Sequence, residues 1–198
     1  MVRWVGAVLA AGRATRFDPP GAKLRTPLGG RALLTWALSA CADARLLAAR
    51  AVVVGRDRFD DLVPTGFEVI VNPHPERGLA SSLALAAAWA EADGASGMVV
   101  GLADQPFITA QAWDAVAAAP EEVDLAVATY AGSRANPVRI ARRLFGALPV
   151  SGDVGARALF ARRDLTVVSV SCQGDPMDVD TRHDLSRAEE RADEGEGG

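Results

Sequence analysis

The sequence predicts an α/β protein with three layers, α/β/α, in which helices cover both faces of a mostly parallel sheet. Two observations support this fold class. Strand-like and helix-like segments alternate through the first two thirds of the chain, and several strand-like segments are continuous apolar runs, as expected for buried strands. Because ligands of such sheets bind beyond the carboxyl ends of the strands, polar segments that directly follow these runs are candidate sites.

The individual elements follow from periodicity. Val5–Ala11 is an apolar run that predicts the first strand. Apolar residues between Leu33 and Cys41 recur at helical spacing, which predicts a helix that begins near Arg31. Further strands are predicted at 51–55, 67–71, 97–103, 124–130, 137–140 and 166–170, and further helices at 58–62, 79–92, 109–118, 141–147, 155–163 and from 181 onward.

Local signals refine three of these elements. Thr109 is a suitable N-cap for the helix that follows it. Thr181 and Asp184 have the spacing of a capping box at the start of the last helix. The strand at 137–140 begins with Pro137, which lacks an N–H donor, and is therefore predicted at the edge of the sheet.

The domain organisation is simple. We find no internal repeat and no linker-like segment, which predicts a single domain over residues 2–188. The last residues, 189–198, read E-E-R-A-D-E-G-E-G-G. This composition supplies little apolar surface to bury and predicts a disordered acidic tail.

Charge and cysteine usage exclude several classes of protein. The net charge of −4 and the sequence pI of about 5.2 argue against a general binder of nucleic acid or of anionic membranes. No run reaches the ~18 consecutive apolar residues of a membrane span. Cys41 and Cys172 lie far apart without C-x-x-C spacing, so neither a zinc site nor a disulfide framework is indicated. A soluble protein of the reducing cytoplasm is expected.

The basic residues are concentrated at the beginning of the chain. Residues 1–42 contain six Lys or Arg and one acid, Asp18. Gly12, Arg13, Arg16 and Lys23 follow the first predicted strand, and a glycine turn with basic side chains presents N–H groups and positive charge that suit phosphate. Lys23 is the only lysine of the chain. The alternative is that this lysine lies on a solvated loop and is present by chance, without a function.

Three acidic residues are candidate metal ligands. Asp104 directly follows the predicted strand 97–103, so it should share a sheet edge with the Gly12 loop. Asp178 and Asp180 are two residues apart and point to the same side of an extended segment. Carboxylates of this kind suit Mg²⁺. The alternatives are that Asp104 is a turn residue and that Asp180 only supplies a favourable charge at a helix start.

Common nucleotide-binding and hydrolase motifs are missing. Only Gly12 of the G-x-G-x-x-G dinucleotide pattern is present, which disfavours a nicotinamide oxidoreductase. The P-loop motif is also missing, because Leu24 follows Lys23 where that motif needs a serine or threonine. His74 and His183 lie near no obvious nucleophile, so a hydrolase with a catalytic histidine has little support.

Several motifs in the same order resemble the nucleotidyltransferases related to molybdenum cofactor cytidylyl- and guanylyltransferases. The resemblance spans Val5 to about Leu185. Two departures are an insertion at Asp18–Gly21 and Asn136, which stands where many cytidylyltransferases have histidine. The matching segments are Leu9–Arg16 with Lys23, Leu24–Arg31, Asn72–Leu83, Leu102–Pro106, Asn136–Val138, Gly152–Arg157 and Asp178–Leu185.

This resemblance implies a Rossmann-like sheet of the nucleotide-diphospho-sugar transferase type and Mg-dependent transfer of a nucleotidyl group from a nucleoside triphosphate to a phosphate monoester. Mg²⁺ is the implied cofactor, with Mn²⁺ as the alternative. The implied site residues are catalytic Arg16, Lys23 and Asp104; nucleotide-binding Leu9, Ala10, Ala11, Gly12, Arg13, Arg16, Lys23, Gly78, Ser81 and Ser82; acceptor-binding Arg134, Asn136, Gly152 and Asp153; and metal-binding Asp104, Asp178 and Asp180.

The resemblance also indicates the substrates. Guanylyl relatives commonly have glycine where this chain has Ala11, and its methyl group narrows the room for a purine, so CTP is favoured over GTP. The expected acceptor is molybdopterin or molybdenum cofactor, and a molybdoenzyme is an expected recipient of the product. The alternatives are another phosphorylated acceptor, such as a sugar phosphate, or a non-catalytic cofactor carrier. Each of these site residues also has a purely structural alternative. Ser81 and Ser82 would then be polar residues at a helix start, and the residues of plain polar turns would be Arg134, Asn136, Gly152 and Asp153.

Overall fold

The structure is a computed structural model that describes residues 2–17 and 22–196. Its main sheet has seven strands in the order β5-β4-β1-β6-β8-β7-β9. Neighbouring strands are parallel except at β8, which is antiparallel to β6 and β7. The prediction of a mostly parallel sheet is therefore confirmed. The strands are β1 Trp4–Ala10, β4 Leu47–Val54, β5 Phe67–Val71, β6 Gly97–Leu102, β7 Leu125–Tyr130, β8 Ser133–Ala141 and β9 Val167–Ser171, with a separate hairpin of β2 Pro27–Leu28 and β3 Arg31–Ala32.

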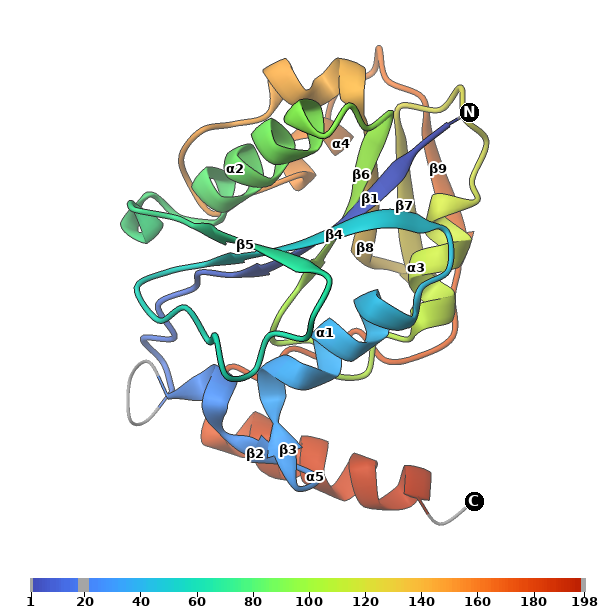
Figure 1. The fold of residues 1–198 in the computed structure, drawn as a ribbon. Coiled ribbons are helices and arrows are strands. Elements are labelled where there is room, and N and C mark those ends of the chain that lie inside the picture. The colour runs from blue at the N-terminus through green and yellow to red at the C-terminus, as the bar shows by residue number, and fades with distance from the viewer. Residues whose placement is uncertain (1, 18–21, 197–198) are drawn as a thin grey trace.

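Helices cover both faces of this sheet, as predicted (Figure 1). Helices α1 and α3 lie on one face and α2 and α4 on the other, while α5 lies beside the β2–β3 hairpin. Val8 and Ala10 of β1 belong to the apolar cluster of α1 and α3, whereas Val5 and Leu9 belong to that of α2. The helices are α1 Leu33–Asp43, α2 Leu79–Ala92, α3 Ala110–Ala117, α4 Arg157–Phe160 and α5 Arg182–Glu196, with 3-10 helices η1 Lys23–Arg25, η2 Pro75–Arg77 and η3 Arg142–Ala147.

Several local predictions are confirmed. β5 and α2 have the predicted bounds. Thr109 caps α3, because its Oγ1 accepts a hydrogen bond from the Ala112 N–H at 3.2 Å. Thr181 and Asp184 form the predicted capping box: the Thr181 N–H donates to Asp184 Oδ2 at 2.9 Å, and the Asp184 N–H donates to Thr181 Oγ1 at 3.2 Å. These bonds fix the start of α5.

The prediction of an edge strand at 137–140 is wrong. β8 covers Ser133–Ala141 and lies between β6 and β7. Pro137 is tolerated there because the register with β7 shifts after Val127, and neither neighbouring strand pairs with Asn136 or Pro137. The missing N–H therefore costs no ladder hydrogen bond.

Three predicted helices also differ. The segment near Arg58 forms a turn instead of a helix. Arg25 fixes this turn by donating to the carboxylates of Asp57 and Asp61, each at 2.8 Å. The predicted helices at 141–147 and 155–163 are the 3-10 helix η3 and the four-residue α4.

The C-terminal segment differs from the predicted disordered tail, since α5 continues to Glu196. Ala192 packs against the apolar cluster of α1, and Arg191 Nε lies 3.0 Å from Asp175 Oδ2. These contacts hold the helix beyond the predicted domain end. The insertion at Asp18–Gly21 and the last two residues lie outside the described residues. Within residues 2–17 and 22–196, no helix combines the length and the apolar composition that a membrane crossing needs.

Candidate active site

The carboxyl ends of β1 and β6 form the floor of a cavity of about 480 Å³. The two strands are parallel neighbours, with Leu9 opposite Leu102, and the Ala103 N–H donates to the Leu9 carbonyl at 3.1 Å. The loop that begins at Ala11 and the carboxylate of Asp104 therefore start from the same edge. This confirms the prediction that the two polar segments lie together.

The N-terminus of α2 forms one wall of the cavity and carries a loop from farther along the chain. Gly78 precedes the helix with φ 84°, and a Cβ atom there would lie 2.4 Å from Asp153 Oδ1 and 2.7 Å from the Gly152 carbonyl oxygen. The Gly152 N–H donates to the Arg77 carbonyl at 2.8 Å, and the Gly152 carbonyl accepts from the Ala80 N–H at 2.9 Å. Only glycine allows this close approach of the loop to the helix.

The loop after β1 forms another wall of the cavity. Residues 11–16 all line the cavity. Apart from its two chain neighbours, no described residue lies within 4 Å of a Cβ atom placed at Gly12, and Gly12 does not have positive φ. Packing within the protein therefore does not require glycine here. The space beside Gly12 suits a ligand that approaches the backbone closely.

The acidic side of the cavity is built by a backbone hydrogen bond between two distant segments. The Val179 N–H donates to the Asp104 carbonyl at 2.9 Å, and Val179 is fully buried. Because side chains alternate in extended backbone, Asp178 and Asp180 both point away from the core, and both line the cavity with Asp104. Asp184 further fixes Asp180 by accepting from its N–H at 3.2 Å.

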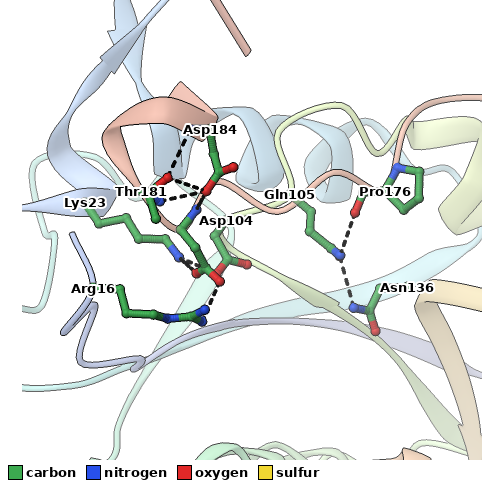
Figure 2. Close-up of polar contacts among 9 residues, drawn as sticks. Arg16, Lys23, Asp104, Gln105, Asn136, Pro176, Thr181 and Asp184 are labelled. Atoms are coloured by element: carbon green, nitrogen blue, oxygen red, sulfur yellow. Dashed lines mark hydrogen bonds and ion pairs between the residues drawn. The ribbon is translucent and has the colours of Figure 1, made fainter. Parts of the chain in front are cut away.

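Lys23 bridges two of these acids (Figure 2). Its Nζ donates to Asp104 Oδ2 at 2.6 Å and to Asp180 Oδ1 at 2.7 Å. Arg16 Nη2 donates to the other oxygen of Asp180 at 2.6 Å. Lys23 is only 5% exposed. Burial alone would lower the pKa of Lys23, but Asp104 and Asp180 outweigh it and raise the pKa, so the ammonium is charged at neutral pH.

The remaining polar atoms on this side favour a cation. Asp104 Oδ1 is buried and has no hydrogen-bond partner among the described residues. Two effects raise the pKa of Asp178. The larger is the partial removal of its carboxyl from water, and the other is the negative charge of Asp104 and Asp180. In the described part of the chain, however, no three His, Cys, Asp or Glu side chains are grouped closely enough to hold a metal. The expected Asp104–Asp178–Asp180 metal site is therefore not assembled as a trio here.

Two hydrogen-bond networks, one buried and one part-buried, connect segments that adjoin the cavity. Asn72 Nδ2 donates to Ser81 Oγ at 2.9 Å and to Ser82 Oγ at 3.0 Å, and ties the start of α2 to the end of β5. Gln105 Nε2 donates to the Pro176 carbonyl at 3.1 Å, and Gln105 Oε1 accepts from Asn136 Nδ2 at 3.0 Å (Figure 2). The second network positions the segment before Asp178.

The structure brings most of the expected nucleotide-binding and metal-binding residues together. The expected residues that line the cavity are Leu9, Ala10, Ala11, Gly12, Arg13, Arg16, Lys23, Gly78, Ser82, Asp104, Asp153, Asp178 and Asp180.

Four expected site residues lie elsewhere. The Ser81 hydroxyl donates to the Gly78 carbonyl at 2.8 Å and does not line the cavity. Arg134 lies over the Phe160 ring, and Asn136 is bonded to Gln105. Gly152 contributes its backbone to the α2 wall instead of lining the cavity. Of the expected acceptor-binding residues, only Asp153 reaches the cavity, and it lies on the α2 side.

Sequence reasoning assigned no site role to several residues that shape the cavity. Thr15 and Glu76 line it, while Asn72 and Gln105 support its walls from behind. A signal was available for Asn72 and Gln105, because both lie inside motifs that carry the resemblance. Thr15 and Glu76 gave no such signal, because both occupy positions that these motifs leave variable.

A mostly parallel sheet, a glycine loop with basic residues at one strand end and carboxylates at the next together indicate an α/β protein that binds a nucleotide or another phosphate ligand. The family model of the MobA-like NTP transferase domain matches residues 6–167. The chain belongs to this family.

Comparisons with individual proteins agree with this assignment. The chain is 30% identical over 193 residues to the purine catabolism protein PucB of Bacillus subtilis (strain 168), covering 89% of this chain and 91% of that protein. It is also similar to the crystal structure of Rv0371c from Mycobacterium tuberculosis H37Rv, with a TM-score of 0.83, 28% identity and coverage of 96% and 99% of the two chains.

A second structure of that protein is a complex with manganese. Its TM-score to this chain is 0.81 at 26% identity, and the similarity covers 96% of this chain and 99% of that one. A nucleotidyl transferase from Methanothermobacter, at 18% identity and a TM-score of 0.81, shares the fold. The fold of the chain is therefore that of solved nucleotidyltransferases.

Proposed function

We propose that this nucleotidyltransferase transfers CMP from CTP to the phosphate monoester of a pterin acceptor of the molybdenum cofactor type and releases pyrophosphate. One observation carries the proposal. The ammonium of Lys23 and the carboxylates of Asp104 and Asp180 meet in one cavity with the Gly12 loop and the α2 N-terminus. Groups that suit phosphate and groups that suit a divalent cation thus line the same cavity of about 480 Å³.

In this proposal the loop of residues 11–16 and Lys23 bind the β- and γ-phosphates. An acceptor oxygen forms a bond to the α-phosphorus while the bond from that phosphorus to the β-phosphate oxygen breaks, and the electron pair leaves with pyrophosphate. Arg16 and Lys23 lower the barrier by neutralising charge that develops on the leaving group. Asp104, the third proposed catalytic residue, would act by holding the divalent cation.

The acidic side of the cavity offers carboxylates that would hold a divalent cation, although not as the expected trio. Asp104 has a buried oxygen without a partner among the described residues, and Asp178 and Asp180 lie on the same wall. Such a hard-oxygen set suits Mg²⁺, which binds through one or two carboxylates and keeps several waters. When bound, the cation would supply Lewis-acid polarisation of the α-phosphate. Manganese is the alternative, since it is present in a structure of a similar protein.

The choice of base and acceptor has separate support. Ala11 lines the cavity and is buried, and its methyl group leaves less room for a purine than glycine would. Asp153 lines the same cavity, and we keep it with Arg134, Asn136 and Gly152 as the acceptor-side set to be tested. The alternative function is transfer of GMP or another nucleotide to a different phosphorylated acceptor.

Product analysis tests the proposal. The protein is incubated with Mg²⁺, a pterin monophosphate and each of CTP, GTP, ATP and UTP, and products are weighed by mass spectrometry. The expected result is a pterin product heavier by one CMP together with pyrophosphate. A product from GTP alone would contradict the assignment of CTP as the substrate. The absence of a product with every triphosphate and phosphorylated acceptor would favour the alternative of a non-catalytic cofactor carrier.

A further inference from the structure

Lys23 has two proposed duties that its single ammonium group cannot perform at once. In the structure, Nζ lies 2.6 Å from Asp104 and 2.7 Å from Asp180, so it neutralises the acids that are proposed to hold the cation. In the proposed reaction the same ammonium binds phosphate. Hydrogen-bond distances of this kind leave no room for a cation between the ammonium and both carboxylates.

The backbone that carries Lys23 is anchored by several hydrogen bonds, so a change of partner needs movement of its side chain alone. The Thr26 N–H donates to the Lys23 carbonyl at 3.2 Å at the end of η1. Arg25, two residues after Lys23 in η1, anchors the same helix through the carboxylates of Asp57 and Asp61. The four-carbon stem of lysine is flexible enough to move the ammonium while this backbone stays in place.

We propose that Lys23 is an exchangeable counter-ion. It holds Asp104 and Asp180 in the free protein, and it moves to the phosphates of the nucleotide when a divalent cation takes its place on these acids. This inference rests on the proposed function and adds a coupling between its two ligands. The cation displaces the Lys23 ammonium from the acids and so frees it for the phosphates, while the phosphates draw the ammonium away and so free the acids for the cation. The cation and the triphosphate should therefore each strengthen the binding of the other by the same factor.

The first test measures Mn²⁺ binding without nucleotide, by electron paramagnetic resonance, in the wild type, Lys23→Met and Arg162→Met. Arg162→Met is the matched control, because it also removes one positive charge, and Arg162 pairs with Asp164 away from the cavity. We expect Lys23→Met to bind Mn²⁺ at least about tenfold more tightly than the wild type and the control, within the usual range of coupling between sites. Equal affinities in all three proteins would overturn the proposal.

The second test uses the wild-type protein and does not depend on a variant that folds. Lys23 is the only lysine, so protein labelled with ¹³C,¹⁵N-lysine gives a single ¹⁵Nζ signal in NMR spectra. We expect this signal to shift when Mg²⁺ and a non-hydrolysable CTP analogue are added together. An unchanged signal, under conditions in which both ligands are bound, would overturn the exchange.

The two proposals fail in different ways. If Mn²⁺ binds the wild type and Lys23→Met equally, the exchange is wrong and the proposed transferase site stands. If neither protein binds Mn²⁺ with or without nucleotide, the cation site in the proposed function is wrong, and the exchange falls with it.

Discussion

Gly78→Ala should destabilise the protein, because the new Cβ atom would lie 2.4 Å from Asp153 Oδ1 and 2.7 Å from the Gly152 carbonyl oxygen. The carboxylate can rotate away, but the Gly152 carbonyl is held by the Ala80 N–H and must move with its loop. Alanine at φ 84° adds backbone strain. Strain of about 1–3 kcal/mol together with about 1 kcal/mol for a weakened backbone hydrogen bond gives a loss of roughly 2–4 kcal/mol.

Thermal unfolding followed by circular dichroism measures this loss. At about 2–4 °C per kcal/mol for a protein of this size, the melting temperature should fall by roughly 4–16 °C. Gly12→Ala is the matched control, since Gly12 lines the same cavity without positive φ and its added Cβ would lie within 4 Å of no described residue other than its chain neighbours. It should melt at or slightly above the wild-type temperature but bind CTP more weakly. Unchanged melting of Gly78→Ala, or an equal loss in Gly12→Ala, would refute the reasoning.

Three further predictions concern catalysis, the core and pH. Lys23→Met should lower the rate of pyrophosphate release by about 10²–10³, and Asp104→Ala should abolish it; unchanged release in either variant would contradict the assigned roles. Arg139→Met should lower the free energy of unfolding by about 3 kcal/mol in urea titrations, because the fully buried guanidinium donates to three carbonyls at the end of α3; a loss below about 1 kcal/mol would contradict this. Burial would raise the pKa of Asp124, but the Thr166 N–H and Arg143 outweigh it and lower that pKa. The ionised Asp124 carboxylate therefore stabilises the folded protein above pH ~4, and this stabilisation is lost as the pH falls through the pKa that Asp124 has in the folded protein. Asp124→Asn should therefore be less stable than the wild type at pH 7, with a gap that closes in acid; a constant gap would contradict the assignment.

The fold could be predicted largely because its signals are local. Continuous apolar runs mark β1, β4 and β6, and the caps at Thr109 and Thr181 lie next to the helices they begin. The position of β8 could not be predicted in this way. Its proline is acceptable only because the register shifts opposite it, and a register is a property of three strands together.

The candidate site was predictable in its location but not in its internal contacts. The strand-end rule placed the Gly12 loop beside Asp104, and alternation placed Asp178 and Asp180 on one side. The pairing of Lys23 with Asp104 and Asp180 joins residues 81 and 157 positions apart, and no local pattern encodes it. The same holds for Ser81, whose hydroxyl bonds to the helix start instead of facing the cavity.

The central claim is that the loop after β1 and the acids after β6 and before α5 bind one triphosphate and one cation. A crystal structure with Mn²⁺ and a non-hydrolysable CTP analogue tests it most directly. The expected result is an anomalous manganese peak beside Asp104 and Asp180, with the phosphates on residues 11–16 and Lys23. Nucleotide bound elsewhere, or manganese away from these acids, would contradict it.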